Sequence, residues 1–273
     1  MRRAATITRT LDRVGPWDSV PTTGSLRGMH VETAGPDAAT DLILLHGGIG
    51  TGRYHWSKVC GPLAERYRLH MPDLPGHGRT PLPDDGRYDR QVLIDALRDL
   101  LDDIGRPAHV AGFSMGGHTA MGLAQSEPDA FASLILIGVS VRDHEGLGGW
   151  RSRFDPDVLA ERYPVWARSL ARLHEPLGGD DAWRDVLTRD SAGDLDVEVD
   201  LDALGRMGAP VLLIRGDRDP AVQPSHYAEL REVWGEQSEE LVVPNGGHDV
   251  QLTRHRLVIQ PMLDFLGRAT DTE

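Results

Sequence analysis

The chain has little cysteine and no long hydrophobic run. The single cysteine, Cys60, excludes an internal disulfide and a cysteine-cluster metal site. No stretch approaches the ~20 apolar residues that a membrane-spanning helix needs. Residues 1–9 contain arginines but lack the apolar segment of a signal peptide. These absences predict a cytoplasmic protein with no membrane partner.

Positive charge is also scarce. Lys58 is the only lysine, and 29 basic side chains stand against 42 acidic ones, which gives a net charge of −13. Nucleic acids and anionic membranes bind basic surfaces, so we expect neither as a partner. We expect a small-molecule substrate, and the one protein partner that we allow for is a second copy of the chain in a homodimer.

From residue 28 onward, short apolar runs alternate with helical patterns. The clearest helix is predicted over Arg90–Ile104, followed by Gly105 and Pro107. This alternation predicts a mostly parallel sheet with helices on both faces, an α/β fold. The predicted strands are Met29–Thr33, Asp41–His46, Arg68–Pro72, Ala108–Phe113, Ser133–Gly138, Pro210–Arg215 and Glu240–Pro244.

Residues 140–207 interrupt this alternation. They show helical patterns, several prolines and no convincing strand, so we interpret them as a helical cap over the carboxyl end of the sheet. Trp150 and Trp166 in this cap are predicted to form an apolar wall of a substrate site. The predicted organisation is an N-terminal arm (1–27), a core (28–139 and 208–268) and the cap (140–207).

Gly112-Phe113-Ser114-Met115-Gly116 is the most informative motif. It follows an apolar strand and has the G-x-S-x-G pattern of a nucleophile elbow. Such a turn exposes the serine hydroxyl, and its glycines let strand and helix approach without Cβ clashes. We therefore predict Ser114 as a nucleophile.

A serine nucleophile needs a base, and the base needs an acid to orient it. The required order of serine, acid and histidine occurs in this chain. Asp217 and Asp219 both follow an apolar strand, and His248 lies in a glycine-rich loop after the next. We predict Asp219 as the acid and Asp217 as a residue that caps the turn through backbone N–H groups.

An oxyanion hole needs a second backbone donor from an earlier loop. The strand ending at Leu45 leads into His46-Gly47-Gly48-Ile49, where glycines allow the main chain to approach the substrate. We predict the N–H groups of Gly48 and Met115 as donors, with Gly47 and Ile49 next to the substrate. His46 could be read as a base, but we favour a role in holding the loop by hydrogen bonds.

These motifs together resemble the α/β-hydrolase superfamily over roughly residues 28–268. The five matching segments, in the family's order, are His46-Gly47-Gly48, Met71–Arg79, Gly112–Gly117, Gly216–Asp219 and Gly247-His248. The resemblance implies a mostly parallel eight-stranded sheet with a helical cap. It implies Ser114 as nucleophile, Asp219 as acid and His248 as base, a structural role for Asp73, and no metal or organic cofactor.

The fold and catalytic residues leave the substrate open, because this superfamily hosts many reactions. We expect a serine hydrolase that cleaves a carboxylic ester of a small to medium, partly apolar substrate. The alternatives are a carbon–carbon bond hydrolase of a ring-cleavage-type diketone, a peptidase, a non-hydrolytic lyase or cyclase, and a ligand receptor. Similarity of the Gly112–Gly116 elbow to cofactor-free esterases favours the first.

Overall fold

A single eight-stranded sheet runs through the computed structural model, which describes residues 22–143, 154–191 and 199–270. The strand order is β1-β2-β4-β3-β5-β6-β7-β8; β2 pairs antiparallel with both β1 and β4, and the remaining pairs are parallel. The predicted fold class is thereby confirmed. The strands are β1 (Thr22–Leu26), β2 (Met29–Ala34), β3 (Asp41–Leu45), β4 (Arg68–Pro72), β5 (Ala108–Phe113), β6 (Phe131–Ile137), β7 (Val211–Gly216) and β8 (Ser238–Val243).

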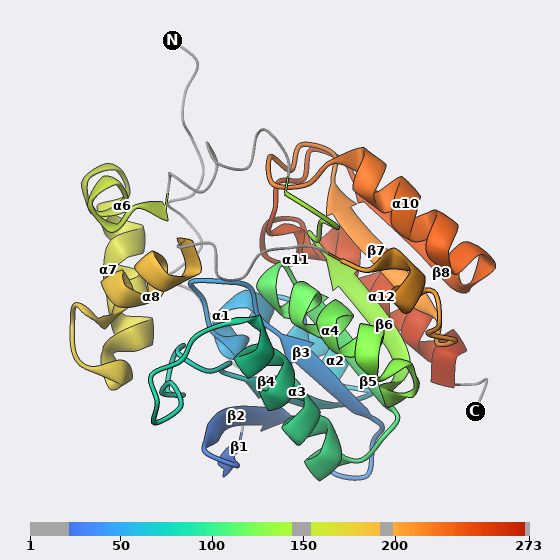
Figure 1. The fold of residues 1–273 in the computed structure, drawn as a ribbon, viewed down its shortest axis with the longest axis horizontal. Coiled ribbons are helices and arrows are strands. Elements are labelled where there is room, and N and C mark those ends of the chain that lie inside the picture. The colour runs from blue at the N-terminus through green and yellow to red at the C-terminus, as the bar shows by residue number, and fades with distance from the viewer. Residues whose placement is uncertain (1–21, 144–153, 192–198, 271–273) are drawn as a thin grey trace.

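Helices cover both faces of this sheet (Figure 1). In β6, Leu134 and Leu136 pack on one face while Ile135 and Ile137 pack on the other, as the two-residue period of a strand requires. Both faces are buried, which explains the continuous apolar runs of the central strands. One face carries α3 (Arg90–Ile104), α4 (Met115–Ser126), α9 (Leu201–Leu204) and α10 (Pro224–Trp234), and the other carries α1 (Gly52–Trp56), α2 (Cys60–Ala64) and α12 (His255–Thr270).

Helix α3 begins and ends where the sequence predicts. Asp89 caps its first turn by accepting a hydrogen bond from the Val92 N–H at 2.9 Å, and Gly105 follows its last residue with φ +115°. Its leucines face the core cluster beneath it. The remaining short elements are α11 (Val250–Thr253) and the 3₁₀ turns η1 (Pro128–Ala130), η3 (Glu175–Leu177) and η4 (Gly235–Gln237).

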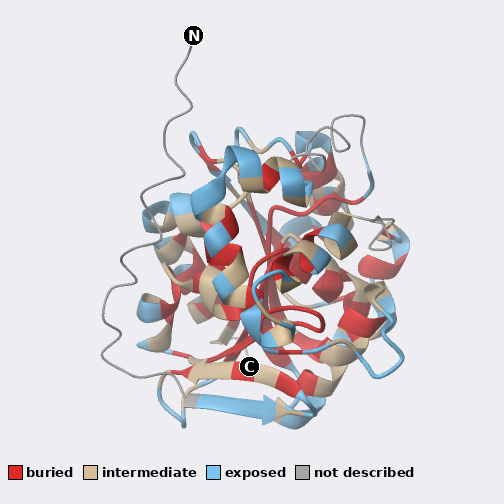
Figure 2. Cartoon of the chain, turned by 90° about the vertical axis from the view of Figure 1, so that its left-hand side faces the viewer, coloured by how far each residue is buried: buried red, intermediate tan, exposed pale blue. Residues whose placement is uncertain are grey.

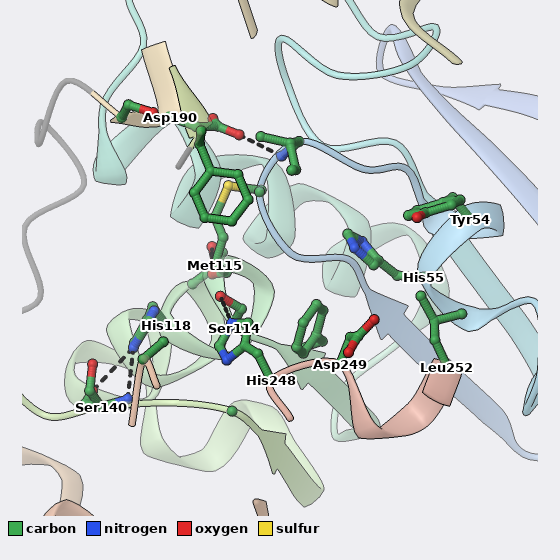
Figure 3. Close-up of a pocket in the computed structure, with 18 of the residues that line it drawn as sticks. Tyr54, His55, Ser114, Met115, His118, Ser140, Asp190, His248, Asp249 and Leu252 are labelled. Atoms are coloured by element: carbon green, nitrogen blue, oxygen red, sulfur yellow. Dashed lines mark hydrogen bonds between the residues drawn. The ribbon is translucent and has the colours of Figure 1, made fainter. Parts of the chain in front are cut away.

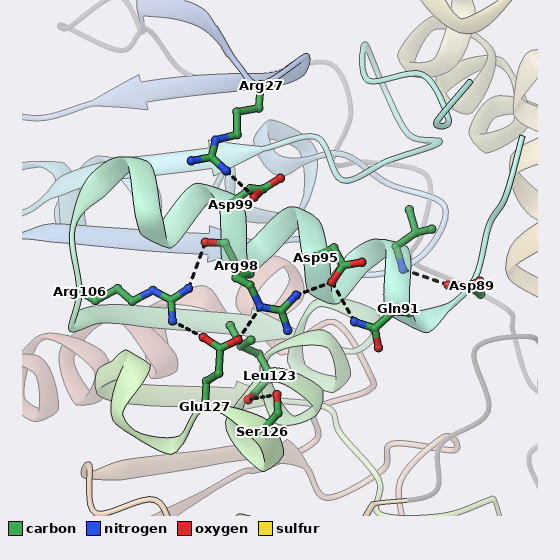
Figure 4. A network of polar contacts seen from close by, with 11 residues as sticks. Arg27, Asp89, Gln91, Asp95, Arg98, Asp99, Arg106, Leu123, Ser126 and Glu127 are labelled. Carbon is green, nitrogen blue, oxygen red and sulfur yellow. Dashed lines mark hydrogen bonds and ion pairs between the residues drawn. The ribbon is translucent and has the colours of Figure 1, made fainter. Parts of the chain in front are cut away.

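Charged side chains also link α3 to the end of α4 (Figure 4). Glu127 accepts hydrogen bonds from Arg106 and Arg98, and these two guanidinium groups hold the pKa of Glu127 below its usual value. The groups are partly exposed, and such pairs contribute about 0–1 kcal/mol each. The apolar contacts between the two helices therefore decide how they pack.

A helical insert lies beside the carboxyl end of the sheet (Figure 1). We use this name for α6 (Pro156–Arg162), α7 (Pro164–His174) and α8 (Ala182–Ser191). Its own small core contains Leu159, Leu170, Trp183 and Leu187, and it closes over Ile49 of the loop after β3. The two ends of the predicted 140–207 cap do not join this small core. Val141 and Val199 instead belong to the cluster that packs α3 and α4 on the sheet.

Strand β1 was not among the predicted strands. Residues 22–26 fall in the predicted N-terminal arm, yet all five pair with residues 29–33 of β2. The strand lies at the edge of the sheet and is largely exposed (Figure 2), so it carries no apolar pattern that a sequence window could detect. Residues 1–21 of the predicted arm lie outside the described residues.

Candidate active site

Ser114 occupies a sharp turn between β5 and α4. Its backbone has φ +48° and ψ −115°, an unusual conformation for a residue with a side chain. A Cβ on Gly112 would lie 2.6 Å from the Gly117 Cα, and one on Gly116 would lie 2.6 Å from the His46 carbonyl oxygen. Only glycine fits at these two positions, which explains the G-x-S-x-G spacing.

Three residues from separate loops meet at this turn, and Figure 3 shows two of them, Ser114 and His248. The His248 Nε2 lies 3.0 Å from the Ser114 Oγ, and the His248 Nδ1 lies 2.8 Å from the Asp219 Oδ2. The Asp219 side chain is 1% exposed, so its contact with His248 is shielded from water. Since β5, β7 and β8 are parallel, the loops after them meet at one edge of the sheet.

The two candidate acids have different partners. Asp219 contacts His248 with Oδ2 and accepts the Ala221 N–H with Oδ1 at 2.8 Å, which orients the carboxylate. Asp217 instead accepts the Gly246 N–H at 3.2 Å and so braces the loop that carries His248. The structure thus brings Asp219 to the histidine and leaves Asp217 in a turn.

The predicted oxyanion donors face the same cavity. Met115 begins α4, where N–H groups have no acceptor within the helix, and Gly48 belongs to the loop after β3. His46 Nδ1 donates to the Gly47 carbonyl at 2.8 Å, while His46 Nε2 accepts the Leu74 N–H at 2.8 Å. In a trans peptide C=O and N–H point in opposite directions, so this bond aims the Gly48 N–H away from His46.

His46 is therefore engaged with the backbone through both ring nitrogens. Burial lowers its pKa well below the ordinary 6.5, so the ring is neutral. Asp73 also holds this region, because its two oxygens accept the N–H groups of Gly52 and Arg79 at 3.1 Å each. Both residues act on loop geometry rather than on Ser114.

A cavity of about 360 Å³ opens in front of Ser114. Of the predicted substrate contacts, Ile49 and Trp166 line it. Gly47 is not a lining residue; a Cβ there would lie 2.7 Å from the Phe113 ring, so it serves close packing instead. Trp150 lies outside the described residues. The apolar part of the wall includes Leu93, Phe113, Met115, Phe154, Trp166 and Leu252.

Several polar residues of the wall were missed by sequence reasoning. Burial lowers the pKa of His55 to about 3 and raises the pKa of Asp249. Burial, with the charge of Asp249, raises the pKa of Tyr54 to about 12. Asp249 adjoins His248 in the sequence and could have been suspected, whereas Arg90, His118 and Asp190 have no local signal.

Within residues 22–143, 154–191 and 199–270, no three histidine, cysteine, aspartate or glutamate side chains are grouped to hold a metal ion. In the same ranges, no helix combines the length and hydrophobicity needed to cross a bilayer.

The order of motifs, the sheet and the meeting of Ser114, His248 and Asp219 define an α/β-hydrolase-type architecture. Residues 42–260 match the model of the alpha/beta hydrolase family. The chain belongs to this family.

Proteins named for different activities are similar to this chain in sequence. Lipase LipV from Mycobacterium tuberculosis is 32% identical over 231 residues, covering 83% of this chain and 77% of that protein. The dihydrolipoyllysine-residue acetyltransferase component of the acetoin cleaving system of Pseudomonas putida is 30% identical over 254 residues. That match covers 86% of this chain but 65% of the longer relative.

Among solved structures, carboxylesterase CesB from Bacillus subtilis superposes with a TM-score of 0.70 at 20% identity, covering 92% of this chain and 93% of that one. Identity at this level shows a shared fold. Because one fold carries many reactions, the reaction must be argued from the site.

Proposed function

We propose that the protein is a serine hydrolase that cleaves carboxylic esters through an acyl-enzyme. The observation that carries this proposal is the continuous hydrogen-bonded chain from Ser114 through His248 to the buried Asp219, facing a cavity. Relatives named as lipases and esterases support ester hydrolysis at the level of the family.

In the proposed first step, the Ser114 Oγ attacks the ester carbonyl carbon while His248 Nε2 takes the hydroxyl proton. The carbonyl oxygen becomes an oxyanion that accepts hydrogen bonds from the N–H groups of Gly48 and Met115. One such donor is worth about 3 kcal/mol in comparable sites. Asp219 keeps His248 in the tautomer that can accept this proton and stabilises the imidazolium.

Collapse of the oxyanion breaks the bond to the alkoxide, which takes the proton from His248 and leaves as an alcohol. A water molecule then gives a proton to His248 and attacks the acyl carbon. Ser114 leaves with that proton, and the products are a carboxylic acid and free enzyme.

The cavity favours a small to medium, partly apolar substrate. Its volume of about 360 Å³ lies at the lower end of the range for ligand pockets. Aromatic and aliphatic side chains supply most of the wall, and neutral His55 adds no positive charge to it.

The first experiment is intact mass spectrometry after exposure to a fluorophosphonate, beside hydrolysis of p-nitrophenyl butyrate. We expect one adduct on the wild type and none on Ser114→Ala, with ester turnover lost in that variant. Ser126→Ala is the matched control, since Ser126 ends the same helix away from the cavity and should keep both properties. Absence of an adduct on the folded wild type, or its retention in Ser114→Ala, would refute the proposed function.

A further inference from the structure

Ile49 has a backbone conformation that its side chain disfavours. Its φ is +58°, in the left-handed region, where a β-branched residue is a steric outlier. Such conformations persist only when the surroundings over-determine them. Ile49 directly follows Gly48, so whatever holds Ile49 also sets the geometry of the predicted oxyanion donor.

Both polar groups of Ile49 are held by the insert. The Ile49 N–H donates to the Asp190 Oδ2 of α8 at 2.6 Å, drawn as a dashed line in Figure 3. The Ile49 carbonyl accepts from the His174 Nε2 of α7 at 3.1 Å. The His174 Nδ1 accepts the Gly78 N–H at 3.0 Å, so the ring is the tautomer that can donate to Ile49.

Asp190 is itself anchored to the core. Its Oδ2 also lies 3.2 Å from the His77 Nε2, and its Oδ1 accepts the Tyr88 hydroxyl. The side chain is 8% exposed. Burial alone would raise the pKa of Asp190, but His77, Tyr88 and the Ile49 N–H together hold it below its usual value. The carboxylate is therefore a fixed, charged acceptor for the Ile49 N–H.

The peptide groups on both sides of Gly48 are thus restrained from different parts of the molecule. His46 of the core holds the Gly47–Gly48 peptide, and Asp190 of the insert holds the Gly48–Ile49 peptide. The space beside Gly48 is filled by the same carboxylate, because a Cβ there would lie 2.9 Å from the Asp190 Oδ2. The direction of the Gly48 N–H depends on both restraints.

We propose that Asp190 and His174 are positioning residues that complete the oxyanion hole when the insert is seated on the core. They act through Ile49 and touch no reacting atom. The insert thereby covers the cavity and also orients the Gly48 N–H group of the proposed oxyanion hole. This inference rests on the proposed function and assigns the insert a role in the rate of the chemical step.

The test compares Asp190→Ala, Asp190→Asn and Asp181→Ala with the wild type. We expect Asp190→Ala to lower kcat by about 10- to 100-fold, with KM changed less than about threefold, because the oxyanion forms only in the transition state. Asp190→Asn should recover most of the rate, since its amide oxygen can still accept the Ile49 N–H. Asp181 is an exposed carboxylate directly before α8, and Asp181→Ala should match the wild type.

Inhibition by a trifluoromethyl ketone distinguishes a positioning role of Asp190 from a purely structural one. It adds to Ser114 to form a stable tetrahedral oxyanion, so its Ki should rise in Asp190→Ala by the factor lost in kcat/KM. A change confined to KM, or an unchanged Ki beside a reduced kcat, would overturn the inference.

A second comparison separates the loss of positioning from general damage to the fold. Glycine adopts left-handed φ values without the penalty that isoleucine meets. In an Ile49→Gly background, Asp190→Ala should therefore cost a smaller factor in kcat than in the wild type. An equal fold-loss of kcat in both backgrounds contradicts the inference. If the wild type takes no adduct and cleaves no ester, the proposed function fails first and the inference fails with it.

Discussion

At the residue scale, two of the four non-glycine residues with positive φ in the described part of the chain line the cavity. These two residues are Ser114 and Ile49. The two are restrained differently. Ser114 is held by the local packing of β5 on α4, which glycines permit, whereas Ile49 is held by side chains from the insert.

The roles of Asp219 and Asp217 can be separated by a matched pair of substitutions. Asp219→Asn should lower kcat by about 10⁴-fold, because an amide facing Nδ1 favours the wrong tautomer of His248. Asp217→Asn should change kcat only slightly, since Asp217 accepts a backbone N–H in a turn. Steady-state kinetics with one ester measures both, and the reverse pattern would show that the acid has been misassigned.

At the element scale, the insert is the part of the molecule whose packing bears most directly on the site. Its small core is separate from the two large clusters on the faces of the sheet, and Ile49 is its link to the loop after β3. Elements that share few contacts with a main core can open without global unfolding. The proposed oxyanion hole therefore depends on the least extensive of the three clusters.

Leu170→Ala tests this independence. Leu170 is fully buried in the insert, and truncation of such a leucine costs about 2–5 kcal/mol. We expect faster amide hydrogen exchange in α7 and α8, measured by mass spectrometry, while β5 and β6 keep their protection. Equal loss of protection in the sheet would mean that the insert and core unfold as one unit.

At the scale of the whole molecule, neutral histidines buried where the insert meets the core link stability to pH. Burial lowers the pKa of His55 to about 3 and of His174 to about 4. In the unfolded chain both should titrate near 6.5. Between these values the unfolded state binds more protons, so each histidine lowers the free energy of unfolding as pH falls from about 6.5.

The effect of one histidine can be isolated with His55→Gln. Each such histidine removes up to about 1.4 kcal/mol per pH unit in this window. Buried carboxyls with raised pKa values, Asp73 and Asp249, act in the opposite direction, so the comparison must be between proteins. Urea unfolding at pH 7 and pH 5 should show a smaller loss of stability on acidification for His55→Gln; an equal loss would exclude a neutral His55.

Most strands of the sheet and the three candidate catalytic residues could be predicted from local patterns. The strands β4 and β5 and the helix α3 have the predicted bounds, because apolar periodicity and capping residues act within a few neighbours. The exposed edge strand β1 escaped, since it lacks that periodicity. The choice of Asp219 over Asp217 followed from loop position, and the structure places Asp219 against His248.

The sequence by itself determined the order of the motifs, the family and the residues proposed for the reaction, because elbow, acid loop and histidine loop are each encoded in short windows. Only the tertiary structure decided how the cavity is lined and how the loop after β3 is held. Asp190 lies 141 residues from Ile49 in the chain, and no local pattern encodes a contact at that separation. It arises because the insert folds back onto the carboxyl edge of the sheet and buries a carboxylate among backbone and side-chain donors.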